Sequence, residues 1–283
     1  MSILILLILG FSLFAEKVSE GIFAYKVGQF EVFVLVEAER EGNVAILIDV
    51  DEEILKNHIP ETGFKHSTNA FLIKTSEQNI LIDAGTGAGR SILEKIELLG
   101  LEKEEIDTIL LTHLHFDHFG GLRTENDRNF PNAKIYLSKE ELLQFTEVNP
   151  NQAAIETIEL YSDNVVTFDA NMLDEPHNEL MPGIIPIANF GHTPGHTVFL
   201  VENNGEKLII AGDFLHVPLV QFSNPDISAT FDVDPVMAAF SRKQIIDYAA
   251  KNKIPIGGMH IVLPGIGNVI SENELFNFIP LDF

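Results

Sequence analysis

The chain has 283 residues, of which 46% are hydrophobic and 21% charged, with no cysteine and a formal net charge of −24. This composition is typical of a globular protein that can bury a large core. The excess of acidic side chains repels phosphate backbones, so it argues against nucleic acid as a partner and favours small neutral or apolar molecules. The absence of cysteine excludes disulfides, thiolate nucleophiles and cysteine-bound zinc, and leaves histidine and carboxylates as metal ligands.

The first fifteen residues, MSILILLILGFSLFA, form an uncharged apolar run that stops at Glu16. This run is too short to span a bilayer, which needs about 20 apolar residues, but it suits the core of a signal peptide. We therefore predict a signal peptide at 1–15 and a single domain at 16–283. The protein is then exported, periplasmic or secreted, with no stable membrane insertion after processing. The alternative is a buried N-terminal strand, which would make the protein cytoplasmic.

Apolar residues that alternate or run continuously indicate strands, and apolar residues that recur every three to four positions indicate helices. In chain order they predict a hairpin of 28–39 and 43–50, a hairpin of 69–75 and 78–85, a helix at about 89–99, strands at 106–112 and 133–138, helices from 139 and at 151–161, strands at 183–190, 197–203 and 207–213, a helix at 235–253 and a strand at 254–259. Ser138 with Glu141 three residues later has the pattern of a capping box. Strands with interspersed helices predict an α/β protein with mixed sheets.

Three histidines and an aspartate lie within THLHFDHFGG, residues 112–121. His113 and His115 are alternate residues, so in an extended segment their side chains point the same way and can bind one ion. Asp117 and His118 must point elsewhere, because adjacent side chains diverge. The spacing therefore predicts two ligands for one metal and two for a neighbouring metal.

Each metal needs further ligands from distant segments, because zinc takes four or five. His192 in GHTPGHT, Asp213 in IIAGDFLH and His260 in GGMHIVLPG are the candidates, and each follows an apolar strand. The ends of strands are a common place for functional residues. The isolated histidines are expected at surface or hydrogen-bonded positions rather than as ligands: His58, His66 and His177.

The motifs THLHFDHFGG, GHTPGHT and AGD resemble those of the metallo-β-lactamase-fold hydrolases, whose fold is a four-layer αββα sandwich with two mixed β-sheets. The resemblance runs from LIDAGTGAG to MHIVLPGIGNV. It implies a first metal bound by His113, His115 and His192, and a second bound by Asp117, His118 and His260, with Asp213 bridging both. It also implies that Asp83 and His196 hold ligands in place without binding metal themselves.

Two divalent cations about 3.5–4 Å apart can share a water molecule and make hydroxide available near neutral pH. One cation also polarises the oxygen of the substrate. The sequence therefore predicts a dinuclear metal-dependent hydrolase in which a metal-bridging hydroxide attacks the substrate, with Asp117 or Asp213 handling the proton. Histidine and aspartate ligands favour Zn2+, with iron, manganese and cobalt as alternatives.

Within this superfamily, the stretches AGDFLHVPLVQFSNPDISATFDVDP and MHIVLPGIGNV resemble the methyl parathion hydrolase-like branch, which adjoins the acyl-homoserine lactonases. This resemblance implies a lactone, ester or phosphotriester substrate and a homodimer. His216 stands where lactonases have a tyrosine, and it is either a catalytic donor or proton shuttle or a surface histidine. Phe64, Phe116 and Phe119 are either lining of an apolar pocket or core residues.

Two other functions stay open. One is a β-lactamase of the kind that has no cysteine ligand. The other is an exported metal-binding protein without catalysis. A panel of ester, lactone, phosphotriester and lactam substrates separates all three.

Overall fold

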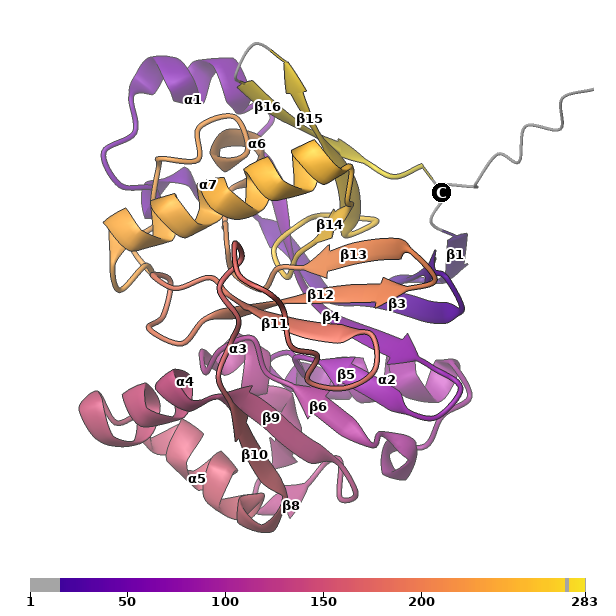
Figure 1. The fold of residues 1–283 in the computed structure, drawn as a ribbon. Coiled ribbons are helices and arrows are strands. Elements are labelled where there is room, and N and C mark those ends of the chain that lie inside the picture. Colours follow the sequence, from indigo (N-terminus) through magenta and orange to yellow (C-terminus); the bar gives the residue numbers. More distant parts are fainter. Residues whose placement is uncertain (1–15, 273–274, 283) are drawn as a thin grey trace, which may run out of the picture.

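Strands outnumber α-helices in the part of the chain that the computed structural model describes, residues 16–272 and 275–282 (Figure 1). The strands are β1 Glu16–Ser19, β2 Ile22–Val27, β3 Phe30–Glu41, β4 Lys65–Lys74, β5 Asn79–Ile82, β6 Thr108–Leu110, β7 Arg123–Thr124, β8 Asp127–Arg128, β9 Lys134–Ser138, β10 Val165–Phe168, β11 Ile184–Ala188, β12 Thr197–Asn203, β13 Glu206–Ile210, β14 Ile256–Gly257, β15 Ile266–Glu272 and β16 Leu275–Pro280. The helices are α1 Glu52–His58, α2 Ser91–Leu98, α3 Phe116–Phe119, α4 Lys139–Leu143, α5 Gln152–Leu160, α6 Pro218–Gln221 and α7 Pro235–Asn252.

Fourteen of these strands build two mixed sheets, and β7 and β8 form a separate antiparallel pair. The larger has the order β1-β2-β3-β4-β5-β6-β9-β10, and the smaller has the order β11-β12-β13-β14-β15-β16. In the larger sheet β5, β6, β9 and β10 run parallel, and in the smaller sheet β13 and β14 do. The remaining pairs within these sheets are antiparallel.

Four layers result, because each sheet is apolar on both faces. Side chains such as Phe71 of the larger sheet and Phe199 of the smaller one meet between the sheets. Ile96 of α2 and Ala154 of α5 pack on the outer face of the larger sheet. Ile246 of α7 packs on the outer face of the smaller sheet, where Figure 1 shows this helix lying along it. The predicted αββα sandwich is confirmed.

The predicted strand at 43–50 is wrong. Val44–Ile46 forms a 3-10 turn instead, and the side chain of Asn43 caps it by accepting a hydrogen bond from the N–H of Ala45 at 2.9 Å. The neighbours of β3 in the sheet are β2 and β4. A short alternation of apolar residues does not distinguish a strand from such a turn when a capping asparagine precedes it.

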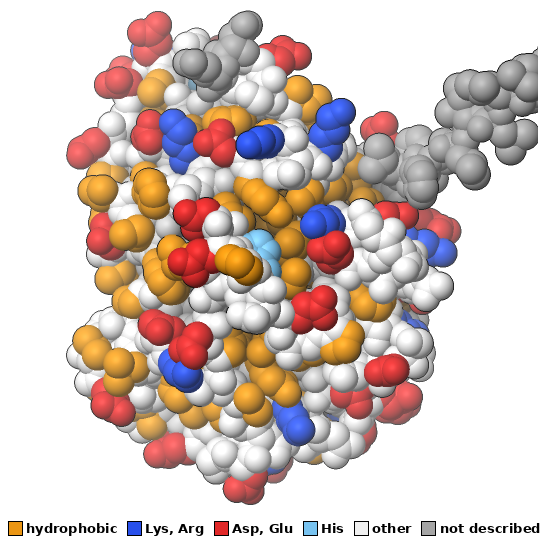
Figure 2. Space-filling model, in the orientation of Figure 1, with side chains coloured by type: hydrophobic (Ala, Val, Ile, Leu, Met, Phe, Trp, Pro, Cys, Tyr) orange, Lys and Arg blue, Asp and Glu red, His pale blue; other side chains and the backbone are white. Residues whose placement is uncertain are grey.

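The surface carries the expected acidic excess, and Figure 2 shows acidic side chains outnumbering basic ones on one face. The predicted signal peptide at 1–15 lies outside the described residues. Among the residues that are described, no helix is long and apolar enough to cross a membrane.

Candidate metal centre

The predicted ligands converge at one edge of the sandwich. The histidine-rich loop follows β6 and continues into α3, while His192, Asp213 and His260 follow β11, β13 and β14. The loop's closing glycines permit this course, because a Cβ on Gly121 would lie 2.0 Å from the carbonyl oxygen of Ala84. Larger residues would push the loop off the segment after β5.

A first cluster consists of His113, His115, His192 and Asp213, whose ligand atoms all lie within 4.8 Å of one another. His115 Nδ1 is 3.0 Å from His113 Nε2 and 2.9 Å from His192 Nε2. His113 Nε2 and His192 Nε2 are 3.2 Å apart. Asp213 Oδ2 lies 3.6 Å from His192 Nε2. Three imidazole nitrogens therefore surround one point, with a carboxylate oxygen beside it.

A second cluster consists of Asp117, His118, Asp213 and His260. His260 Nε2 is 3.0 Å from Asp213 Oδ2 and 3.7 Å from Asp117 Oδ2. His118 Nε2 and Asp213 Oδ1 are 3.2 Å apart, yet both atoms are buried without a hydrogen-bond partner among the described residues. Asp213 belongs to both clusters.

Hydrogen bonds on the far side of four rings place the Nδ1 proton away from the clusters. Nδ1 of His113 lies 3.1 Å from Thr112 Oγ1, and Nδ1 of His118 lies 2.6 Å from Asp83 Oδ2. Nδ1 of His192 lies 3.0 Å from Asp232 Oδ1, and Nδ1 of His260 lies 2.8 Å from the carbonyl oxygen of Ser67. In its neutral form each ring thereby presents the lone pair of Nε2 to the cluster. This arrangement is typical of histidines that bind metal.

The electrostatics of the two clusters differ. Burial holds the pKa of His113 and of His192 well below the usual value, so both rings are neutral. Burial also opposes charge on His260, but Asp213 and Asp117 outweigh it and raise the pKa of His260 to about 9. Burial is likewise outweighed at His118, where Asp213 and Asp83 raise the pKa. Without metal, the carboxylates of the second cluster therefore favour the protonated, positively charged forms of His118 and His260.

These donor sets fit divalent cations. Three neutral imidazole nitrogens facing one another cannot all be satisfied by mutual hydrogen bonds, because each lone pair needs a donor. A cation at their centre would satisfy all three. In the second cluster, a cation would likewise satisfy the unpartnered atoms of His118 and Asp213 and balance the charge of the two carboxylates.

Asp83 and His196 lie beside the clusters. Asp83 is fully buried and accepts hydrogen bonds from the N–H of Thr112 at 2.8 Å and from its hydroxyl at 2.7 Å, in addition to the bond from His118. His196 has both ring nitrogens engaged: Nδ1 faces the carbonyl of Asn189 and Nε2 accepts from the N–H of Asp213, both at 3.0 Å. Neither residue has a free atom to offer a metal.

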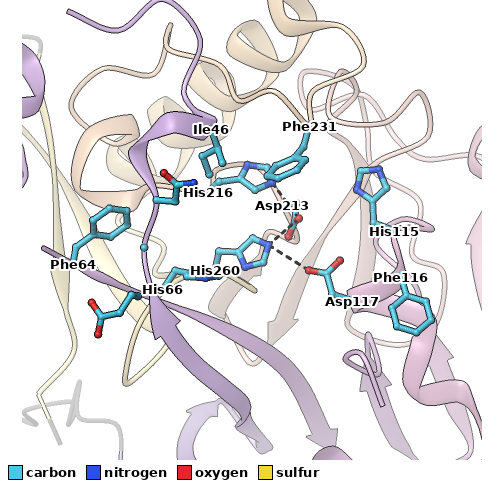
Figure 3. A pocket seen from close by; sticks show the side chains of 13 residues that line it. Ile46, Phe64, His66, His115, Phe116, Asp117, Asp213, His216, Phe231 and His260 are labelled. Carbon is cyan, nitrogen blue, oxygen red and sulfur yellow. Dashed lines mark hydrogen bonds and ion pairs between the residues drawn. The ribbon is translucent and has the colours of Figure 1, made fainter. Parts of the chain in front are cut away.

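An apolar cavity of about 480 Å³ opens onto the second cluster (Figure 3). Its thirteen lining residues include Ile46, Phe64, Phe116 and Phe231, and none is Lys or Arg. Phe119 does not line it and is buried in the core. His66 does line it, with its ring 5.8 Å from that of His260. His58 and His177 hydrogen-bond to main-chain carbonyls, as expected.

His216 lies in the wall of this cavity and is only 6% exposed, so a surface position for this residue is wrong. Its Nε2 is 3.4 Å from Asp213 Oδ2, and its ring faces Phe231 at 5.3 Å. Figure 3 shows His216, Asp213, His260 and Asp117 grouped at the cavity floor.

Three supporting residues were not predicted. Asp232 accepts a hydrogen bond from His192, and its other oxygen forms an ion pair with the buried Arg242 at 3.2 Å. Glu141 accepts hydrogen bonds from the N–H of Leu114, next to His113, and from the hydroxyl of Thr193, next to His192. Asp232 lies in FDVDP, directly before the predicted helix at 235–253, and no local pattern marks any of the three as part of the site.

A family model of the metallo-beta-lactamase superfamily matches residues 63–253. The chain belongs to this superfamily. The uncharacterized protein YobT of Bacillus subtilis is 31% identical over 153 residues, which are 51% of this chain and 60% of that protein. The chain spans about three fifths of the length of the curated relatives it matches first.

Two solved structures are similar over almost the whole fold. Hydrolase AbOPH has a TM-score of 0.82 and 29% identity, with 93% of this chain and 98% of that chain covered. AidC, described as a dizinc quorum-quenching lactonase, has a TM-score of 0.82 and 27% identity with the same coverage. The predicted superfamily is confirmed, and the prediction of a metal-dependent hydrolase is supported at the level of enzyme class.

Proposed function

We propose that this protein is a dinuclear metal-dependent hydrolase that opens lactones or cleaves esters and phosphotriesters with uncharged, apolar substituents. The observation that carries the proposal is Asp213, whose carboxylate is shared by two ligand clusters at the floor of an apolar cavity. The similarity to AidC, itself a lactonase, puts lactones first among the substrates.

The clusters assign the ligands. His113, His115 and His192 would hold one ion, Asp117, His118 and His260 the other, and Asp213 would contact both. Zn2+ suits these donors, with iron, manganese and cobalt as alternatives. Bound there, two divalent ions would lower the pKa of a shared water toward neutrality and polarise the oxygen of the substrate.

The chain's own residues would do the rest. Asp117 is the more exposed of the two cluster carboxylates, with 32% of its side chain accessible against 3% for Asp213. We therefore assign to Asp117 the transfer of a proton to the leaving oxygen. His216 faces the cavity beside Asp213, and we assign it the role of hydrogen-bond donor to the substrate. The apolar wall would orient the substituent and exclude water, and its lack of Lys and Arg disfavours anionic substrates.

The test is a substrate panel with zinc-, cobalt- and manganese-loaded protein. We expect turnover of lactones, aryl esters or phosphotriesters, and its loss together with metal in His113→Ala. A His113→Ala variant with full activity would refute the proposal. Turnover of a chromogenic lactam alone would favour a β-lactamase, and no turnover by fully loaded protein would favour a non-catalytic metal-binding protein.

We also propose export through residues 1–15 and a homodimer. Cell fractionation with N-terminal sequencing tests the first, and light scattering of the purified protein tests the second. Retention of the intact chain in the cytoplasm, or a monomer at working concentration, would contradict the respective proposal.

A further inference from the structure

Helix α4 begins in an unexpected way. Ser138 caps it as predicted, because its Oγ accepts a hydrogen bond from the N–H of Glu141 at 3.1 Å. A capping box would return the Glu141 side chain to the N–H of Ser138. Instead the Glu141 side chain points inward, and the residue is only 1% exposed. The capping box is therefore only half formed, and the carboxylate has another use.

The Glu141 carboxylate joins two loops. Its Oε1 accepts a hydrogen bond from the N–H of Leu114 at 2.7 Å. Its Oε2 accepts from the hydroxyl of Thr193 at 2.6 Å and from the N–H of Gly195 at 3.1 Å. Leu114 stands between His113 and His115, and Thr193 follows His192. One carboxylate thus ties together the two loops that supply all three imidazoles of the first cluster.

The second of these loops is seated tightly on the start of α4. Ser138 Oγ donates a hydrogen bond to the carbonyl of Gly195 at 2.8 Å. A Cβ on Gly195 would lie 2.2 Å from the backbone nitrogen of Glu141 and 2.4 Å from Ser138 Oγ. The loop cannot shift along the helix, so the carboxylate holds it at a fixed distance from the histidine-rich loop.

We propose that Glu141 is a positioning residue that sets the geometry of His113, His115 and His192 for the first metal ion. The inference rests on the proposed function, since it presupposes that the first cluster binds metal. Within the described residues, the hydrogen bonds of the Glu141 side chain reach neither Asp213 nor His260. Its effect should therefore fall on the first ion.

The cost of burying this carboxylate supports a function. Burial raises the pKa of Glu141 to about 7, although the hydrogen bonds from Thr193, Leu114 and Gly195 oppose the rise. A buried acid is unfavourable for folding unless its hydrogen bonds are needed. A nearby divalent ion would favour the carboxylate form, which accepts from all three donors at once.

Glu141→Gln tests the proposal with almost no change of shape. Its single acceptor oxygen can serve one loop, while its amide N–H groups face the donors of the other. The zinc affinity is measured by chelator competition in two backgrounds: His260→Ala, which disables the second cluster, and His192→Ala, which disables the first. We expect Glu141→Gln to weaken binding about 10- to 100-fold in the first background. In the second background we expect no significant change.

The absorption spectrum of the Co2+-loaded protein provides a second readout, because it reports the coordination of the ion rather than the stability of the fold. Glu141→Gln should change it in the His260→Ala background. Glu140→Gln is the matched control, one residue earlier on the same helix and exposed, and it should change nothing.

Unchanged affinity and spectrum in the His260→Ala background, or an equal loss in both backgrounds, would overturn the proposal. Should Glu141→Gln fail to fold, Thr193→Val decides, since it removes one donor to the same carboxylate; wild-type zinc affinity in that variant would overturn the proposal too. The metal content of the unmodified protein is measured first. If that protein does not bind two ions, the proposed function itself is wrong, independently of Glu141.

Discussion

The two clusters of the centre are held in different ways. The first is built from neutral imidazoles, of which His113 and His192 are buried, on two loops that Glu141 ties together, and Asp232 fixes the ring of His192. The second relies on charge: its carboxylates raise the pKa of His118 and His260, and Asp117 is partly exposed to the cavity. The first cluster is thus organised before metal arrives, whereas protons compete with metal at the second.

This difference predicts that the two metal ions bind with unequal affinity and exchange at unequal rates. The first should bind more tightly and exchange slowly, and the second should exchange more easily and be lost first as the pH falls.

Asp213→Ala should have the largest effect, because Asp213 is the only residue in both clusters. We expect the loss of at least one ion and a fall in kcat/KM of about 10³-fold or more, which corresponds to about 4 kcal/mol of transition-state stabilisation. Metal analysis and steady-state kinetics measure both. Asp247→Ala, at an exposed position of α7, should leave both values unchanged, and two ions with full activity in Asp213→Ala would refute a shared ligand.

Asp232→Asn should weaken the first cluster and the fold together. The amide oxygen can still accept a hydrogen bond from His192, but the guanidinium of Arg242, 1% exposed, loses its anionic partner. Breaking a buried ion pair costs about 3–5 kcal/mol of folding free energy. We expect this loss in chemical denaturation of the metal-free protein, and a first ion bound about 10- to 100-fold more weakly.

The control for Asp232→Asn is Asp234→Asn, at the N-cap of α7. Asparagine caps helices as well as aspartate does, so the stability should hardly change. Equal effects of the two variants would show that the ion pair between Asp232 and Arg242 has no special role.

The pH dependence of stability tests Glu141. Because its pKa is raised from 4.5 to about 7 in the folded protein, the folded state holds the proton more tightly than the unfolded chain. The contribution of Glu141 is therefore most favourable below pH 4.5 and is lost as the pH rises through 7, by roughly 3 kcal/mol in total at about 1.4 kcal/mol per unit. The measurement compares denaturation of metal-free wild type and Glu141→Gln across this range. A constant difference between them would contradict the raised pKa.

Much of the centre could be predicted from the sequence because its ligands have demanding local spacing. His113, His115, Asp117 and His118 fall within six positions, and His192, Asp213 and His260 follow apolar strands. The four-layer fold followed from the same motifs through the family they resemble.

The supporting residues could not be predicted, because each acts across a long stretch of sequence. Glu141 reaches Leu114 and Thr193, and its spacing from Ser138 already had a local explanation as a capping box. Asp232 reaches His192 over 40 positions. Such contacts depend on how the loops pack at the edge of the sheets, which apolar periodicity does not describe. The prediction of a strand at 43–50 failed for the opposite, local reason: the side chain of Asn43 caps a turn at Val44–Ile46, although the apolar residues there alternate as in a strand.

Phe231→Ala should have the smallest effect and should act on the side of the second cluster alone. Phe231 lines the cavity, is 51% exposed and contacts the ring of His216, but it has no bond to a ligand of the first cluster. Removing a half-buried ring should cost about 1 kcal/mol of binding energy, which raises KM for apolar substrates about fivefold. Both metal affinities and kcat should stay the same, and Phe240→Ala, exposed on α7 away from the cavity lining, is the matched control. A change in metal affinity would mean that the cavity wall and the clusters are coupled, and the separation between binding substrate and holding metal would then be wrong.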